Sequence, residues 1–289
     1  RIRGETAISI DELAVICRHF KLSFDAFISN NDTGLVTFSY QRFNNGLDSY
    51  KTYLLNVLAD LQKTLSCETK KITYAAEDIP VFYQFHHPEL AAFKMFYWQK
   101  SIVALPEFEN KQFDIEIIDA EIIKISEQVL ASYLEIPSIE IWNEETVNSS
   151  LMQIAFYWES GIFKNKEDAL AICDHVEKMF ENILKQAETN KKSNDAQDNY
   201  ALYLSDIMIG TNCISIETNG IKSSYLSFHT FNTMFTSNAH FCEETELWLN
   251  NLLKKSNLIS GIAEKQRYQF FKRMHDKLQK LRNKIMEEG

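Results

Sequence analysis

Glycine and proline are scarce in this chain, with 8 glycines and 4 prolines among 289 residues. Average usage would give about 20 glycines and about 14 prolines in a chain of this length. Glycine supplies most left-handed backbone positions and proline supplies rigid turns, so we expect few tight turns and a largely helical fold. Glycine-rich loops that cradle phosphates have little room here, which argues against a nucleotide-binding α/β enzyme.

The charge is negative overall but unevenly distributed. The net charge of −10 argues against a chain that coats nucleic acid over its whole surface. Between Lys254 and Lys284, however, ten basic residues stand against two acidic ones, a local charge of +8. Five scattered cysteines, odd in number and without a C-x-x-C pair, indicate free thiols in a cytoplasmic protein. No apolar stretch approaches the about 18 residues of a membrane-spanning helix, so we expect no membrane partner.

Helical periodicity dominates residues 50–188, which we interpret as an α-helical domain. Its first helix carries an apolar stripe from Tyr50 to Leu65. Amphipathic patterns with polar breaks between them predict further helices at about 88–104, 115–134, 144–160 and 166–188.

A polar run from Thr189 to Asp198 predicts a domain boundary, and the composition changes after it. Residues 199–289 predict a small α+β domain that ends in a long helix from about Ala263. Asn219-Gly220 is a strong signal for a hairpin turn. The β-rich segments are Tyr200–Ile209, Cys213–Thr218 and Lys222–Phe228, and a helix follows near Phe241–Lys254. The predicted fold class is mostly α (α+β), with a β-hairpin or meander.

Residues 1–29 contain two helix starts. Ser9-Ile10-Asp11-Glu12 has the form of a capping box, in which the Ser9 side chain accepts from the Glu12 backbone N–H and Glu12 reaches back. Ser23 begins a second short helix, with Asp25 in its first turn. The polar residues 30–49 then predict a linker, with one short strand at Val36–Tyr40.

The opening residues resemble the second half of a lambda-repressor-like (XRE-type) helix-turn-helix domain. The resemblance rests on Arg1-Ile2-Arg3-Gly4, Ile8-Ser9, Leu13, Ile16, Phe20, Leu22-Ser23, Asp25 and Phe27. In that family the third of five helices enters the major groove, so the resemblance implies that most of the base-reading part precedes Arg1. It also implies that Arg1 and Arg3 contact phosphates rather than base edges.

Two later segments resemble parts of an uncharacterised bacterial regulator-like family. They are Asp78–Phe82 and Pro88–Lys94. This second resemblance implies a regulator body but carries no known chemistry.

No motif indicates catalysis or a cofactor. The chain lacks G-x-S-x-G, H-E-x-x-H, G-x-x-x-x-G-K-[ST] and G-x-G-x-x-G. His86-His87 with Glu89 is the densest group of possible metal ligands, but adjacent histidines do not face one site. Cys173 belongs to an apolar helical stripe, and the acids beside Cys242 suit a helix start. We therefore predict no catalytic residues, no metal and no cofactor.

The terminal helix carries five apolar residues at spacings of three and four. They are Phe271, Met274, Leu278, Leu281 and Ile285. This rhythm is that of a coiled-coil seam, although it covers only about two heptads. The helix either docks on its own domain or forms a dimer seam, which would suit a protein that binds two half-sites. Its basic residues could alternatively contact DNA phosphates without regard to sequence.

The sequence thus predicts a cytoplasmic, DNA-binding transcriptional regulator that acts as a homodimer. Its large aromatic-rich body would sense an unknown small-molecule or protein effector, or mediate assembly. An effector that prefers one arrangement of the body would change the spacing of two DNA-binding headpieces. The alternative is a helical protein-interaction or scaffold module without DNA binding.

Overall fold

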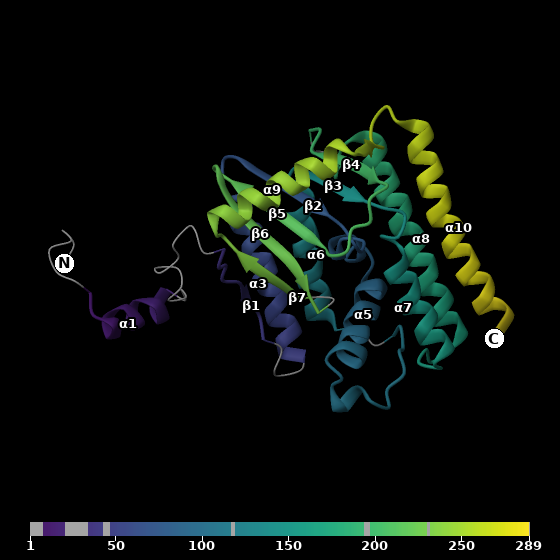
Figure 1. The fold of residues 1–289 in the computed structure, drawn as a ribbon. Coiled ribbons are helices and arrows are strands. Elements are labelled where there is room, and N and C mark those ends of the chain that lie inside the picture. Colours follow the sequence, from purple (N-terminus) through teal and green to yellow (C-terminus); the bar gives the residue numbers. More distant parts are fainter. Residues whose placement is uncertain are drawn as a thin grey trace.

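A single mixed sheet organises the chain (Figure 1). The computed structural model describes residues 8–20, 34–42, 47–116, 119–193, 197–229 and 232–288. Within these ranges eight strands pair in the order β1-β7-β6-β5-β2-β3-β4-β8. The strands are β1 (Ser39–Tyr40), β2 (Lys70–Ala75), β3 (Ser138–Trp142), β4 (Tyr200–Ser205), β5 (Cys213–Thr218), β6 (Ile221–Phe228), β7 (Asn232–Thr236) and β8 (Ser256–Leu258). The predicted α+β, mostly helical class is confirmed.

Helices account for most of the remaining described residues. They are α1 (Ile10–Phe20), α3 (Leu47–Leu65), α4 (Val81–Gln84), α5 (Pro88–Tyr97), the π-helix η1 (Trp98–Ile102), the 3-10 helix η2 (Pro106–Phe108), α6 (Ala120–Glu135), α7 (Asn148–Glu159), α8 (Lys166–Thr189), α9 (Ala239–Lys254) and α10 (Glu264–Glu288). The helices predicted from the periodicity are confirmed, with shifted ends. Over the described ranges, none of them combines the length and apolarity that crossing a bilayer requires.

The centre of the sheet is parallel and its flanks are antiparallel. Strand β3 is parallel to both neighbours, with Ser138 opposite Ile72 on β2 and opposite Tyr200 on β4. Parallel neighbours need long crossover connections, which α4 to α6 and then α7 with α8 provide. Strands β5, β6 and β7 form an antiparallel meander. The predicted turn at Asn219-Gly220 is confirmed, with positive φ at both residues (48° and 80°).

The predicted division into a helical domain and a separate α+β domain needs correction. Strands β2 and β3 lie inside residues 50–188, yet they pair with β5 and β4 of residues 199–289. Both regions also contribute to one hydrophobic core. The polar run after α8 is a loop within this fold, because the buried Lys192 ammonium donates to the carbonyl oxygens of Tyr133 and Ile136.

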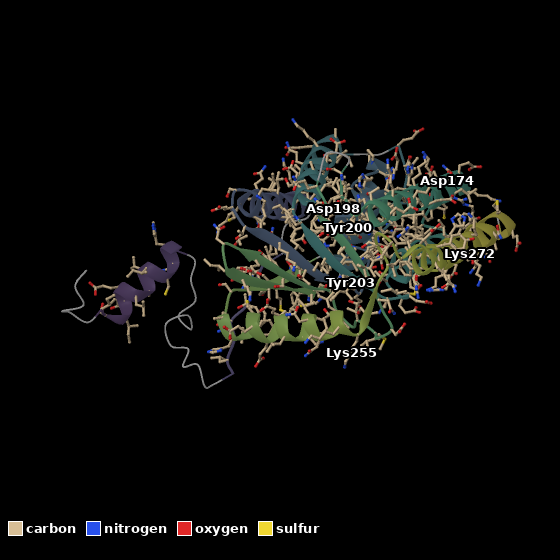
Figure 2. The ribbon with its side chains drawn as sticks, turned by 90° about the horizontal axis from the view of Figure 1, so that it is seen from above. Asp174, Asp198, Tyr200, Tyr203, Lys255 and Lys272 are labelled. Atoms are coloured by element: carbon tan, nitrogen blue, oxygen red, sulfur yellow. The ribbon has the colours of Figure 1, made fainter. Side chains whose placement is uncertain are left out.

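Helices cover both faces of the sheet (Figure 1). Helix α9 crosses one face and contacts β4, β5, β6 and β8, while α3 and α6 pack together on the other face. Successive side chains of β4 point to opposite faces of the sheet, so they pack alternately into the main core and against α9. Tyr200 belongs to the main core, and Tyr203 packs with Leu249 and Leu252 of α9. In Figure 2 the labelled Tyr203 is nearer to α9 than the labelled Tyr200 is.

The capping box at the start of α1 is confirmed. The Glu12 backbone N–H donates to Ser9 Oγ at 3.2 Å, and the Ser9 backbone N–H donates to Glu12 Oε2 at 3.0 Å. Such a reciprocal pair satisfies two backbone donors that a helix end otherwise leaves free. The predicted helix from Ser23 and both Arg1 and Arg3 lie outside the described residues, as do residues 30–33 and 43–46 of the predicted linker. Of the strand predicted at Val36–Tyr40, the structure has Ser39–Tyr40 as β1.

The apolar stripe of α10 is not a dimer seam, which corrects that prediction. All five residues are buried within the chain itself, where α10 packs on α8 and α7. Leu278 and Ile285 have no exposed surface, and the most exposed of the five, Leu281, retains 8%. The same spacing of three and four serves a helix that docks on its own domain, so the rhythm alone did not distinguish the two cases.

The basic face of α10 meets acidic residues of the same chain. Arg282 Nη2 lies 2.5 Å from Asp174 Oδ1 and 2.8 Å from Glu177 Oε2, both on α8. Lys284 Nζ lies 2.5 Å from Glu159 on α7. Figure 2 places the labelled Asp174 of α8 and Lys272 of α10 at the same end of the molecule. Part of the local positive charge of α10 is therefore paired with acidic side chains of α7 and α8.

Replacing Leu278 by alanine tests the docking of α10. The change should lower the free energy of unfolding by about 2–5 kcal/mol, because it leaves a cavity in a closed core. Urea unfolding measures the loss, and Met286→Ala at an exposed position of the same helix should cost much less. The loss should not depend on protein concentration. A loss that depends on concentration would contradict this account and indicate that the stripe forms a dimer interface.

Candidate functional site

A large cavity lies between helix α3 and the sheet. Its volume is about 780 Å³, and its walls come from α3, α4 and α5 and from strands β2, β5, β6 and β7. Cavities of this size are typical of small-molecule sites, which span about 300–1,000 Å³. The strands form the floor of this cavity and α3 its roof.

Aromatic side chains form part of the walls. Those lining the cavity include Tyr50, Tyr53, Tyr74, Phe82, Tyr225 and Phe235. The ring of Tyr50 also packs on Trp98 of the π-helix, with 5.2 Å between ring centroids. Burial raises the pKa of Tyr53 to about 12, so its hydroxyl keeps its proton at neutral pH. The walls therefore offer rings and neutral hydroxyls to a bound molecule.

Polar side chains also line the cavity, among them Asp60 and Lys63 of α3. Three others, Asp78, Gln84 and Lys94, are here called the polar end of the cavity. Asp78 follows β2, and its position is fixed from two sides. Its backbone N–H donates to Asn212 Oδ1 at 3.1 Å, and its Oδ2 accepts from Ser149 Oγ at 2.8 Å. Its other oxygen, Oδ1, is buried and finds no donor among the described residues.

Gln84 and Lys94 are almost completely buried, with 2% and 1% of their surfaces exposed. Over the described ranges, Gln84 Oε1 has no hydrogen-bond partner. Lys94 Nζ donates to Ser150 Oγ at 3.1 Å and to Gln153 Oε1 at 2.5 Å. Buried polar groups are nearly always hydrogen-bonded, so an unpaired oxygen beside a cavity indicates a place where a partner is missing.

Helix α7 connects the two charged groups of the polar end. Gln153 accepts from Lys94 through Oε1, and its Nε2 donates to Ser149 Oγ at 3.3 Å. Ser149 in turn donates to Asp78. A chain of hydrogen bonds thus runs from the ammonium to the carboxylate through two side chains that are one helical turn apart.

Each charged group of the polar end moderates the pKa of the other. Burial raises the pKa of Asp78, while Lys94 and the hydrogen bond from Ser149 oppose that rise. Burial lowers the pKa of Lys94 to about 8, and Asp78 opposes that fall. Lys94 is therefore mostly protonated at neutral pH. The arrangement can bind and orient a polar molecule inside an apolar cavity.

A second buried cluster surrounds Glu140 of β3 but leaves none of its oxygens unpaired. Tyr83 donates to Glu140 Oε1 at 2.6 Å, and Tyr133 donates to the same oxygen. Trp142 Nε1 and the Tyr200 hydroxyl donate to Oε2 at 2.9 and 3.3 Å. Burial raises the pKa of Glu140, which the nearby Lys192 and these donors counteract. With every acceptor occupied, the cluster acts as a joint between helices and sheet.

The histidines singled out in the sequence gather with a third one. The ring of His87 lies 5.2 Å from that of His175 on α8 and 6.4 Å from that of His86, centroid to centroid. His175 Nε2 lies 3.5 Å from Glu89 Oε2. Burial lowers the pKa of His87 to about 4, so that ring is neutral at pH 7. Within the described residues, no group of three or more side chains is arranged to hold a metal ion.

The cysteines weighed in the sequence lie in packed surroundings. Cys173 is fully buried in the main core, and burial raises its pKa to about 12, which keeps its sulfur as an unreactive thiol. Cys242 is on the buried face of α9, and Ser224 Oγ of β6 lies 3.4 Å from its sulfur.

The polar end was missed from sequence alone. Its clearest signal was Lys94, a charged residue inside the otherwise apolar run from Leu90 to Phe96. A lysine at such a position is almost never fully buried unless other groups accept hydrogen bonds from its ammonium. Comparisons with protein-family models, with curated proteins and with solved structures each gave no match. The assignment of a site therefore rests on the geometry.

Lys94→Met should change how stability depends on pH. Because the folded pKa lies near 8 and the unfolded pKa near 10.4, the unfolded chain holds more protons between these values. The contribution of Lys94 to stability thus rises with pH across that window. The difference in unfolding free energy, wild type minus Lys94→Met, should grow from pH 7.5 to pH 10 in urea titrations. Lys185→Met, at an exposed position of α8, should not reproduce the trend, and a flat difference for Lys94 would contradict this account.

Proposed function

We propose that this protein is a cytoplasmic, DNA-binding transcriptional regulator whose body senses a small molecule in the cavity between α3 and the sheet. The observation that carries the sensing role is the polar end, where buried oxygens of Asp78 and Gln84 have no donor within the part of the chain that the structure describes, beside a cavity of about 780 Å³. An apolar cavity with a few convergent polar groups is the usual form of a ligand site.

The surroundings of the polar end suit a sensor. Asp78 and Lys94 are tied to α7 through Ser149 and Gln153, and α7 packs against α8 and α10. A molecule bound at the polar end would therefore compete for or reinforce hydrogen bonds that hold a helix outside the cavity. A ligand shifts a conformational equilibrium only by such differential contacts.

The DNA-binding role is supported by the resemblance of residues 1–28 to the second half of an XRE-type domain. The capping box at Ser9 and Glu12 starts a helix where that resemblance implies one. In the proposal Arg1 and Arg3 contact phosphates at the end of the groove-reading helix. Two copies would bind two half-sites, and their contact would use a surface other than the buried stripe of α10.

A second candidate function is a protein-interaction or scaffold module without DNA binding. It is favoured by the outer face of α9, where Leu247 is 63% exposed and Trp248 is 44% exposed. Exposed large apolar side chains that lie next to each other often mark contacts with other proteins.

DNA binding can be measured on the natural protein, including any residues that precede Arg1. Fluorescence anisotropy against genomic duplex fragments should find at least one fragment that binds much more tightly than random duplex, with affinity that falls steeply with salt. Arg1→Ala and Arg3→Ala should each lower the slope of log K against log salt by about 1. Lys185→Ala should leave the slope unchanged. Equal, weak binding to every fragment would favour the scaffold.

A further inference from the structure

The charges at the polar end restrict which molecules the cavity can hold. A low-dielectric interior makes an uncompensated charge costly, so a bound molecule must leave the site close to neutral. The cavity lining contains two carboxylates, Asp78 and Asp60, and two ammonium groups, Lys94 and Lys63. Asp60 and Lys63 interact with each other on α3, and the polar end contains the other carboxylate and the other ammonium. A purely cationic ligand would leave the positive charge of Lys94 without a counter-charge. A purely anionic ligand would leave the oxygens of Asp78 and Gln84 without donors.

The acceptor side of the polar end is held ready for a donor. Asp78 uses Oδ2 and its backbone N–H in hydrogen bonds, and its free Oδ1 is the oxygen without a donor. Gln84 Oε1 is the second such oxygen. Both residues line the cavity. An ammonium group has several N–H donors, which is the chemistry that such oxygens lack.

The donor side is Lys94. Its ammonium has three protons, and the described residues supply two acceptors, Ser150 and Gln153. Both acceptors are neutral, so the positive charge of Lys94 has no carboxylate in direct contact with it. A ligand carboxylate would provide the third acceptor and the counter-charge in one contact, and hydrogen bonds between charged groups are the strong ones.

We propose that the cavity binds a zwitterionic amino compound, with its ammonium on Asp78 and Gln84, its carboxylate on Lys94, and an apolar body among the aromatic walls. The inference rests on the proposed function in taking this cavity as the sensing site. Amino acids with large apolar side chains have this chemistry, and rings such as Tyr50 and Tyr74 suit an aromatic body.

The test uses three probes that share an indole body. L-tryptophan carries both charges, L-tryptophan methyl ester lacks the carboxylate, and indole-3-propionate lacks the ammonium. Added to the full chain at ten times its dissociation constant, L-tryptophan should raise Tm by about 3–6 °C. The ester and the propionate should bind about ten- to a hundredfold more weakly, because each leaves one charged group of the site unpaired.

Two variants separate the contacts. Asp78→Asn should weaken binding of L-tryptophan at least about tenfold while leaving indole-3-propionate unaffected or improved. Lys94→Met should show the mirror pattern, with the methyl ester unaffected or improved. Asp206→Asn, an exposed carboxylate remote from the cavity lining, is the control and should bind all three probes as wild type does.

Several outcomes would overturn the proposal. Equal binding of all three probes to wild type would do so even if a variant fails to fold, because that comparison needs no variant. Full L-tryptophan binding by Asp78→Asn and Lys94→Met would place the probe elsewhere, and no Tm shift with any probe would reject the assigned ligand class. None of these results bears on DNA binding, whose anisotropy readout needs no probe, so the two proposals fail separately.

Discussion

The arrangement of the whole sheet depends on one buried carboxylate. Glu140 stands in the central parallel strand, where it receives donors from α4, α6, β3 and β4. A carboxylate buried without such donors would cost several kcal/mol. Because side chains alternate along a strand, a slip of β3 by one residue would turn Glu140 toward α9 and away from the hydroxyls of Tyr83, Tyr133 and Tyr200. These three donors from neighbouring elements therefore fix the register of β3 and the positions of α4 and α6.

The cavity takes its shape from this joint. Tyr83 anchors the short helix α4 to Glu140, and the next residue, Gln84, lines the cavity. Strand β2 pairs with β3 and leads into Asp78, so the register set by Glu140 also places the carboxylate of the polar end. Buried hydrogen-bond networks rigidify what they connect, and here the rigid part is the wall of the cavity.

Local signals in the sequence predicted local structure well. Three features depend on residues only a few positions apart, and the structure contains all of them: the capping box at Ser9, the turn at Asn219-Gly220 and the amphipathic helices. The short strands β2 and β3 were missed. In β3, Glu140 interrupts an otherwise apolar strand and resembles a surface residue, and in β2 two lysines precede only four less polar residues. The polar end was missed because Asp78, Lys94 and Ser149 meet only through the tertiary fold. Arg1 and Arg3, predicted as phosphate contacts, remain predictions.

Gln153 gives the site a property that composition could not reveal. Its planar amide holds Lys94 at one end and Ser149, with Asp78 beyond it, at the other. Ser149 and Gln153 are four residues apart on one helix, a rise of about 6 Å. Asp78 and Lys94 thus each bind a side chain of the same helix, which holds the two opposite charges at related positions. In the proposed site, a ligand would be selected by the distance between its charged groups as well as by their signs.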